Sequence, residues 1–123
     1  MSKTILLVED DEALNTAFST ILKKNDYTVH AVYDGNEALK LLAEEKVDLI
    51  LLDMLMPELD GIGFLKEYDP PQDDKPYIIV FSNLDAKENI DEAMELGADR
   101  YLLKSWASPK EILHVVEDSL SLA

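Results

Sequence analysis

Five short apolar runs, each followed by a segment of helical periodicity, are the feature that most constrains how this chain can fold. The first, third and fourth runs are nearly continuous in Ile, Leu, Val and Phe, which is typical of inner strands of a parallel sheet. Alternating strands and helices predict an α/β fold with one parallel sheet and helices on both of its faces. The five predicted strands are Thr4–Val8, Thr28–Val32, Leu49–Asp53, Tyr77–Ser82 and Arg100–Leu103.

Capping signals divide the segments between these strands into helices. Asp11 precedes an apolar stripe with helical spacing and is expected to cap that helix. Pro109 suits the first position of the last helix, and Gly97 suits the left-handed residue that closes the fourth. The expected capping pairs, each an N-cap residue followed three positions later by an acid, are Asp34 with Glu37, Asp85 with Glu88 and Ser108 with Glu111.

Composition limits the chain to a small set of classes. Its 123 residues, 47% of them hydrophobic, suit one domain, and we expect residues 1–123 to form it. The net charge of −15 argues against direct binding to nucleic acid or to an anionic membrane. The absence of cysteine excludes disulfides, thiolate metal sites and a cysteine nucleophile. No apolar run approaches the ~20 residues of a membrane span, so a cytoplasmic protein is expected.

Polar residues gather where the predicted strands end. Glu9 and Asp10 follow the first strand, Asp53 ends the third, Ser82 ends the fourth and Lys104 follows the fifth. Ligands of open parallel sheets bind outside the carboxyl ends of the strands, so these residues form the candidate site. Carboxylates gathered there repel each other without a cation, and oxygen donors without histidine or cysteine favour Mg²⁺. An aspartate beside such an ion can act as a nucleophile toward phosphorus.

Five segments of the sequence also match a known family. They are Ile5–Asp11, Leu51–Gly61, Ser82, Gly97-Ala98 and Tyr101–Lys104. Together they resemble the receiver domains of response regulators in two-component phosphorelay systems, and the resemblance covers the whole chain. It implies a flavodoxin-like (βα)5 three-layer sandwich whose strands have the order 2-1-3-4-5.

The resemblance implies a role for each residue of the metal site. Asp53 accepts phosphate from the phosphohistidine of a sensor histidine kinase or of a histidine phosphotransfer protein. Asp10 and Asp53 ligate Mg²⁺ directly, Glu9 does so through water, and Leu55 contributes its backbone carbonyl. The chain is therefore expected to be a phosphoacceptor with intrinsic autophosphorylation and autodephosphorylation chemistry, and not an enzyme.

The resemblance also implies a switch that follows phosphorylation. Lys104 pairs with the phosphoryl group, Ser82 moves to hydrogen-bond it, and Tyr101 swings inward, although Tyr101 also suits a plain half-buried edge position. The surface that changes combines the fourth helix, the fifth strand and the fifth helix, where a downstream partner or a second copy is expected to bind. Apolar residues spread round the last helix favour a docking surface there, with ordinary exposed side chains as the alternative. They are Ile112, Leu113, Val115, Val116, Leu120 and Leu122.

One position departs from the family pattern. Ser105 follows Lys104, where the family usually has proline joined by a cis bond. A cis bond before a residue other than proline costs about 2.5–4 kcal/mol, so we expect a trans peptide and a different path for the loop up to Ser108.

Two other functions compete with a phosphorylation switch. A receiver-shaped interaction module that takes no phosphate would usually have lost the aspartate or the lysine, and both are present. A Mg²⁺-dependent phosphatase generally has a second aspartate two residues after the nucleophile, and Leu55 occupies that position. The phosphorylation switch is therefore the preferred function.

The lifetime of the phosphate gives a prediction from sequence alone. By resemblance, the positions that tune it are Leu55 and Leu84, and neither side chain can hold the attacking water. We expect the double substitution Leu55→Asn, Leu84→Glu to accelerate hydrolysis about tenfold, which is ~1.4 kcal/mol off the barrier. The measurement is phosphate loss in excess Mg²⁺ after the donor is removed. Equal rates, or faster loss from wild type, would show that these leucines are only apolar surface.

Overall fold

The computed structural model describes residues 3–54, 59–70, 72–83, 87–106 and 108–122. All five strands lie where the sequence predicts them, with a helix after each. The elements are β1 (Thr4–Val8), α1 (Glu12–Lys24), β2 (Thr28–Val32), α2 (Gly35–Glu44), β3 (Leu49–Asp53), α3 (Gly61–Glu67), η1 (Gln72–Asp74), β4 (Tyr77–Ser82), α4 (Lys87–Glu95), β5 (Arg100–Leu103), η2 (Lys104–Trp106) and α5 (Pro109–Leu122), where η marks a 3₁₀ helix.

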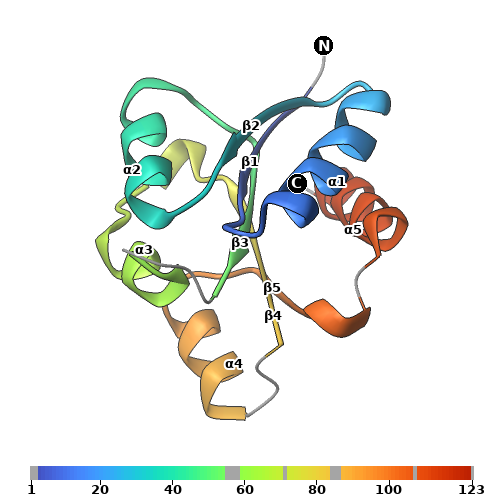
Figure 1. Ribbon diagram of the computed structural model, residues 1–123. Helices are drawn as coiled ribbons and strands as arrows, with labels where there is room; N and C mark the ends of the chain where they lie inside the picture. Colours follow the sequence, from blue (N-terminus) through green and yellow to red (C-terminus); the bar gives the residue numbers. More distant parts are fainter. Residues whose placement is uncertain (1–2, 55–58, 71, 84–86, 107, 123) are drawn as a thin grey trace.

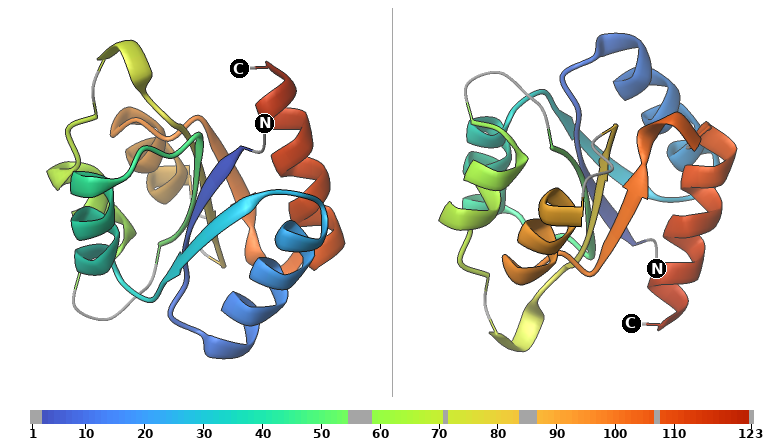
Figure 2. Two further views of the ribbon diagram at one scale, coloured as in Figure 1. Left: turned by 90° about the horizontal axis from the view of Figure 1, so that it is seen from above. Right: turned by 90° about the horizontal axis from the view of Figure 1, so that it is seen from below.

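The sheet is parallel and has the order β2-β1-β3-β4-β5, as expected. Helices α1 and α5 cover one face, and α2, α3 and α4 cover the other, which gives three layers (Figures 1 and 2). Since β1 and β3 are neighbours at the centre, with Val8 opposite Leu52, the residues that follow these strands emerge side by side. The fold class predicted from the sequence is confirmed.

Side-chain alternation divides the core into two clusters. Successive residues of a strand point to opposite faces, so each inner strand supplies both. The cluster under α2, α3 and α4 contains Leu6, Val8, Ile50, Leu52, Ile78 and Val80 from the strands. The cluster under α1 and α5 contains Ile5, Leu7, Leu49, Leu51, Ile79 and Phe81 from the strands. Burial on both faces explains the continuous apolar sequence of β1, β3 and β4.

The capping predictions hold wherever the structure describes the residues. The carboxylate of Asp11 accepts from Leu14 N–H, that of Asp34 from Glu37 N–H, and Ser108 Oγ from Glu111 N–H. Gly97 has a φ of +115° and closes α4, because its N–H bonds to Met94 and the next N–H bonds to Ala93. The predicted cap Asp85 lies outside the described residues.

Helix α5 uses much of its apolar surface inside the protein. Ile112, Leu113 and Val116 are buried in the cluster shared with α1, and Val115 and Leu120 pack against it. The side chain of Leu122 lies outside the described part. The excess apolar surface expected of α5 is therefore smaller than the sequence suggested. Within the described ranges, no helix combines the length and apolarity required to cross a bilayer.

Gly61 allows α3 to begin directly against the end of β3. A Cβ added at Gly61 would lie 2.7 Å from the carbonyl oxygen of Asp53 and 2.8 Å from Cα of Met54. Both atoms belong to the backbone, so they cannot move without displacing the strand. Asp60 caps the helix through a 2.8 Å bond from Gly63 N–H, and the Gly61 N–H bonds to the Met54 carbonyl. The position of Asp53 therefore depends on this close packing.

We expect Gly61→Ala to lower the free energy of unfolding by about 2–3 kcal/mol, because the added methyl group overlaps backbone. Gly63→Ala is the matched control, since its added Cβ would meet the end of the Leu59 side chain, 2.6 Å away, which can rotate. Alanine also favours a helix more than glycine does, so Gly63→Ala should be close to neutral. Denaturant unfolding of both variants measures the difference. Similar losses would contradict the close approach at Gly61.

Candidate phosphoacceptor and metal site

The alternation that builds the core also brings Glu9, Asp53 and Lys104 together. Asp53 comes two residues after Leu51, so its side chain points to the face of the sheet that α1 and α5 cover. Glu9 comes two residues after Leu7 in the neighbouring strand and points to the same face. Leu102 faces the same side, and Lys104 follows it by two residues. Three charged side chains thus extend one face of the sheet beyond its last apolar layer. The structure confirms that they meet at one edge.

Lys104 connects the two buried carboxylates. Its Nζ lies 2.8 Å from Oε1 of Glu9 and 3.2 Å from Oδ2 of Asp53. Glu9 is fully buried and Asp53 is 2% exposed. Burial opposes the charged form of Lys104, but Glu9 and Asp53 outweigh it and raise the pKa of the ammonium above its usual value. Lys104 therefore stays protonated at neutral pH and holds both acids.

Glu9 is a carboxylate whose charged form is strongly disfavoured by burial. Burial raises the pKa of its carboxyl to about 7, against the opposing effects of Lys104 and of the Asp11 N–H, and the charge of Asp53 raises it further. Oε2 accepts from Asp11 N–H at 2.9 Å. Among the described residues, Oε1 receives no hydrogen bond of good geometry, although Lys104 is close. A buried carboxylate oxygen with spare capacity suits an additional cation.

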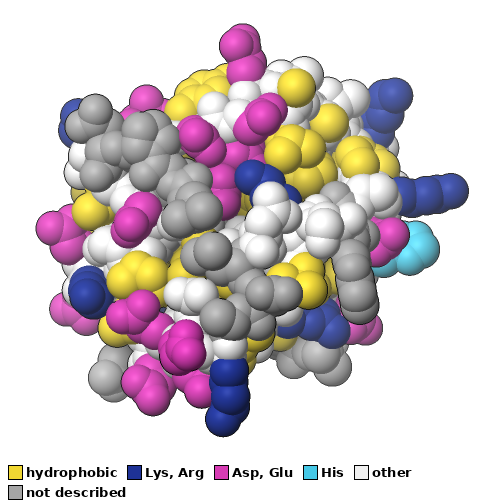
Figure 3. Space-filling view, turned by 60° about the horizontal axis from the view of Figure 1, so that its bottom comes forward, with side chains coloured by type: hydrophobic (Ala, Val, Ile, Leu, Met, Phe, Trp, Pro, Cys, Tyr) yellow, Lys and Arg dark blue, Asp and Glu magenta, His cyan; other side chains and the backbone are white. Residues whose placement is uncertain are grey.

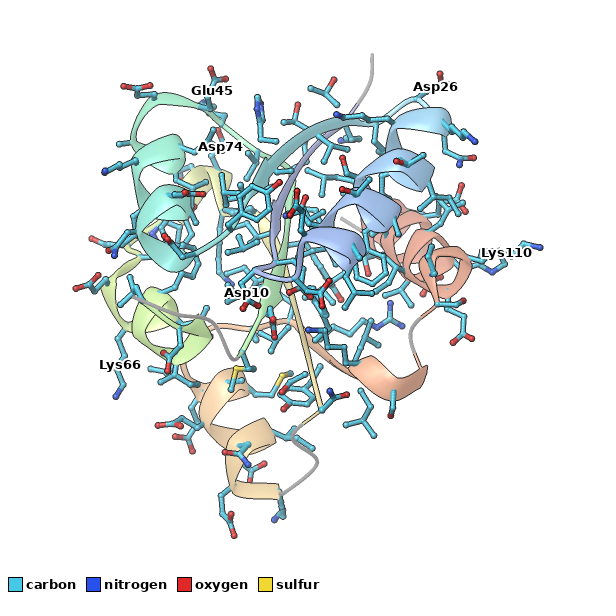
Figure 4. All side chains as sticks on the ribbon, viewed as in Figure 1. Asp10, Asp26, Glu45, Lys66, Asp74 and Lys110 are labelled. Atoms are coloured by element: carbon cyan, nitrogen blue, oxygen red, sulfur yellow. The ribbon has the colours of Figure 1, made fainter. Side chains whose placement is uncertain are left out.

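The site has the donors that a hard metal ion requires. Carboxylate oxygens of Glu9, Asp10 and Asp53 all lie within 4.8 Å of one another. Asp10 lies two residues after the end of β1 (Figure 4). It is exposed, so the cluster opens to solvent on one side. Three carboxylates and one ammonium sum to a formal charge of −2 when all are ionised, which a divalent cation would balance. The oxygen-only donor set fits Mg²⁺.

The wider surface is acidic as well. Figure 3 shows Asp and Glu side chains outnumbering Lys and Arg on the face that it presents. This agrees with the net charge of −15. An acidic surround attracts cations toward the site and disfavours anionic polymers.

The other predicted residues lie around this centre. Asp11 caps α1, as expected, and contributes its backbone N–H to Glu9. Ser82 is 1% exposed and ends β4, one residue beyond the partner of Asp53 in the register. Tyr101 is half-buried and packs on the core cluster under α2, α3 and α4, across the sheet from Lys104. This position agrees with a half-buried edge aromatic, and the switch roles of Ser82 and Tyr101 stay predictions.

The remaining predictions concern three segments, which follow β3, β4 and β5 in the sequence. Leu55, as carbonyl ligand and lifetime residue, and Leu84 both lie outside the described residues. The Lys104–Ser105 peptide is trans, as expected for a bond before serine. The 3₁₀ helix η2 begins at Lys104, so the chain turns immediately after β5 without proline.

Phe81 is a site residue that sequence reasoning missed. Its ring lies beneath Lys104, with Nζ 5.6 Å from the centroid, and packs edge-on against Phe18. An aromatic face attracts a cation and also supports the aliphatic stem of lysine. The signal in the sequence was an aromatic residue one position before Ser82, which resembled an ordinary core residue.

Comparison with known proteins agrees with this geometry. The sequence model of the response regulator receiver domain matches residues 5–117. Response regulator MprA of Mycobacterium ulcerans is 36% identical over 107 residues, which cover 87% of this chain and 46% of MprA. The chain thus spans about half the length of the curated relatives it matches.

Solved receiver domains have the same fold. The receiver domain of the Francisella response regulator 1452 is 30% identical, with a TM-score of 0.84 and coverage of 98% of both chains. A CheY-like receiver domain protein from Methanospirillum hungatei is 26% identical, with a TM-score of 0.89 and coverage of 98% of this chain and 95% of that one. The family match, the strand order and the acidic edge agree, and the chain belongs to the response regulator receiver domain family.

Proposed function

We propose that this domain is a phosphorylation switch in which Asp53 accepts a phosphoryl group with the help of Mg²⁺. The observation that carries the proposal is the buried carboxylate of Asp53, 3.2 Å from the ammonium of Lys104 and clustered with Glu9 and Asp10. A carboxylate held beside one fixed cation, with donors for a second, has the groups that phosphoryl transfer requires. We further propose that it acts as a switch and not as a turnover enzyme.

The residues divide the chemistry between them. A carboxylate oxygen of Asp53 attacks phosphorus, the bond from phosphorus to the donor's imidazole nitrogen breaks, and the imidazole leaves with the electron pair. Lys104 stays close enough to pair with a phosphoryl oxygen. Glu9 and Asp10 would hold Mg²⁺, which would neutralise charge on the phosphoryl oxygens when bound.

The proposed partners follow from this chemistry. The donor is the phosphohistidine of a sensor histidine kinase or of a histidine phosphotransfer protein. The output surface is formed by α4, β5 and α5, where Tyr101 lies half-buried in β5. A downstream protein or a second copy of the domain would bind there after Ser82 and Tyr101 rearrange.

Incubation with Mg²⁺ and a small acyl phosphate separates the three candidate functions. The phosphorylation switch gives a stable mass increase of one phosphoryl group. An interaction module without phosphate chemistry gives no increase, and a phosphatase releases phosphate with continuing turnover. The presence of both Asp53 and Lys104 in one ion pair favours the first outcome.

We expect Asp53→Asn to abolish phosphoryl labelling in that assay, because the amide cannot act as the nucleophile. Asp34→Asn is the matched control: Asp34 also follows a strand, but it caps α2, and asparagine caps equally well. The control should label like wild type by intact-mass measurement. Full labelling of Asp53→Asn, with phosphate on another acid or on His30 or His114, would remove Asp53 from its role.

Glu9 predicts a pH dependence of stability in the absence of divalent cations. Its carboxyl has an ordinary pKa of 4.5, and the folded protein raises that pKa to about 7. Between these values the folded state keeps a proton that the unfolded state has lost, so stability falls as pH rises through this window. Relative to Glu9→Gln, wild type should lose about 2–3 kcal/mol of unfolding free energy between pH 4.5 and pH 8.

Urea unfolding of both proteins across that pH range measures this difference. Added Mg²⁺ at pH 8 should stabilise wild type more than Glu9→Gln, because the ion balances the carboxylate that burial disfavours. Groups that do not contact Glu9 cancel in the comparison, and Lys104, whose pKa is raised above its usual value, stays protonated across this pH range. Parallel pH profiles would show that Glu9 stays ionised without cost.

A further inference from the structure

Asn15 is a buried polar residue on the apolar face of α1. It is 2% exposed and shares the buried side of the helix with Phe18, Ser19 and Leu22. Burying a side-chain amide is unfavourable unless the amide makes hydrogen bonds inside the protein. Its contacts therefore indicate what the position is for.

The side-chain amide of Asn15 bonds to the acidic turn between β1 and α1 and to the end of β2. Its Nδ2 donates to the carbonyl oxygen of Glu9 at 3.0 Å and to that of Val32 at 3.0 Å. Only the NH₂ group of the amide can serve two carbonyls, so its orientation is fixed. One side chain thus joins α1, the turn that carries Glu9 and Asp10, and the end of β2.

The turn is held on both sides of Glu9. The Glu9 N–H donates to the same Val32 carbonyl at 3.1 Å, so Val32 accepts from the backbone of Glu9 and from the side chain of Asn15. The carbonyl of Glu9 belongs to the peptide group that joins Glu9 to Asp10. Fixing this peptide group therefore fixes the backbone positions from which both carboxylate side chains extend. Carboxylates that repel each other would otherwise spread the turn before a cation binds.

We propose that Asn15 is a positioning residue that holds Glu9 and Asp10 in the geometry that binds a divalent cation. The inference rests on the metal site of the proposed function and adds the element that fixes it in advance. Groups that orient metal ligands commonly affect affinity although they do not touch the ion. Asn15 acts through the backbone of Glu9 and contacts neither Mg²⁺ nor phosphate.

The test compares Asn15→Leu, which keeps the branching of the side chain but has no donor, with Ser19→Ala. Ser19 is a buried polar residue one turn farther along the same helix. Mg²⁺ alone is titrated calorimetrically into folded wild type and variants. We expect Asn15→Leu to weaken Mg²⁺ binding about tenfold, and Ser19→Ala to change it by less than twofold. Equal affinities of Asn15→Leu and wild type, or equal losses in both variants, would overturn the proposal.

Amide hydrogen exchange without Mg²⁺ provides the second measurement. The amides of Glu9 and Asp11 are bonded to Val32 and to Oε2 of Glu9, respectively. Asn15→Leu should accelerate their exchange at least tenfold relative to the amides of mid-α1, and unchanged exchange would overturn the proposal. If wild type binds no Mg²⁺, the metal site fails, and exchange still decides whether Asn15 holds the turn.

A third variant covers the case in which Asn15→Leu does not fold. Asn15→Ser keeps one donor in a smaller side chain, so it can satisfy at most one of the two carbonyls. It should lose Mg²⁺ affinity at least twofold and show faster exchange at Glu9 and Asp11. Wild-type values for both measurements would overturn the role of Asn15.

Discussion

The candidate site depends on one interaction, the pairing of the Lys104 ammonium with the carboxylates of Glu9 and Asp53. Two carboxylates with almost no exposure would each favour protonation if left alone, because burial penalises their charge. At an effective dielectric constant near 20, unit charges ~4 Å apart interact by about 4 kcal/mol, so one ammonium offsets only part of the cost of burying two carboxylates. The raised pKa of Glu9 shows the remaining imbalance.

The sheet order makes this contact possible at long range in the sequence. Neighbouring central strands deliver Glu9 and Asp53, whereas Lys104 follows β5, on the far side of β4. A lysine stem is long enough to cross one strand, and the Phe81 ring beneath Nζ gives it an apolar and weakly attractive path. A shorter cationic side chain at residue 104 would not reach both carboxylates. Phe81, which belongs to the apolar layer under the site, thus helps to place the charge of Lys104.

The sequence predicts the scaffold well because its signals are local. Strand bounds follow from runs buried on both faces, and caps such as Asp11 and Ser108 form within three residues of sequence. The edge cluster also follows, since parallel strands end together. Two other features depend on distances between side chains that follow three different strands. They are the contact of Lys104 with two acids and the raised pKa of Glu9. Those distances come from packing, and no local pattern contains them.

Asn15 shows a different limit of sequence analysis. The apolar spacing of α1 predicts which side of the helix is buried, but it does not reveal that the polar residue Asn15 belongs to that side. Its partners are the backbone carbonyls of Glu9 and Val32. Every residue has such a carbonyl, so the sequence does not indicate which ones Asn15 binds. Polar residues on the apolar face of a helix next to a site therefore merit the question of which backbone groups they satisfy. Here the answer leads to Glu9, a proposed metal ligand.

Charge balance connects the proposed chemistry to the proposed movement. Phosphorylation of Asp53 replaces a carboxylate by a group of about −2 charge, so a site of formal charge −2 becomes more negative. Under the proposed function, Lys104 would then have a stronger partner than Glu9, and its ion pairs would redistribute toward the phosphoryl group. Because Lys104 begins η2 directly after β5, such a redistribution would act on the strand that carries Tyr101. A divalent cation at Glu9 and Asp10 would neutralise the carboxylate that Lys104 leaves, so the proposal couples metal binding and switching through this one lysine.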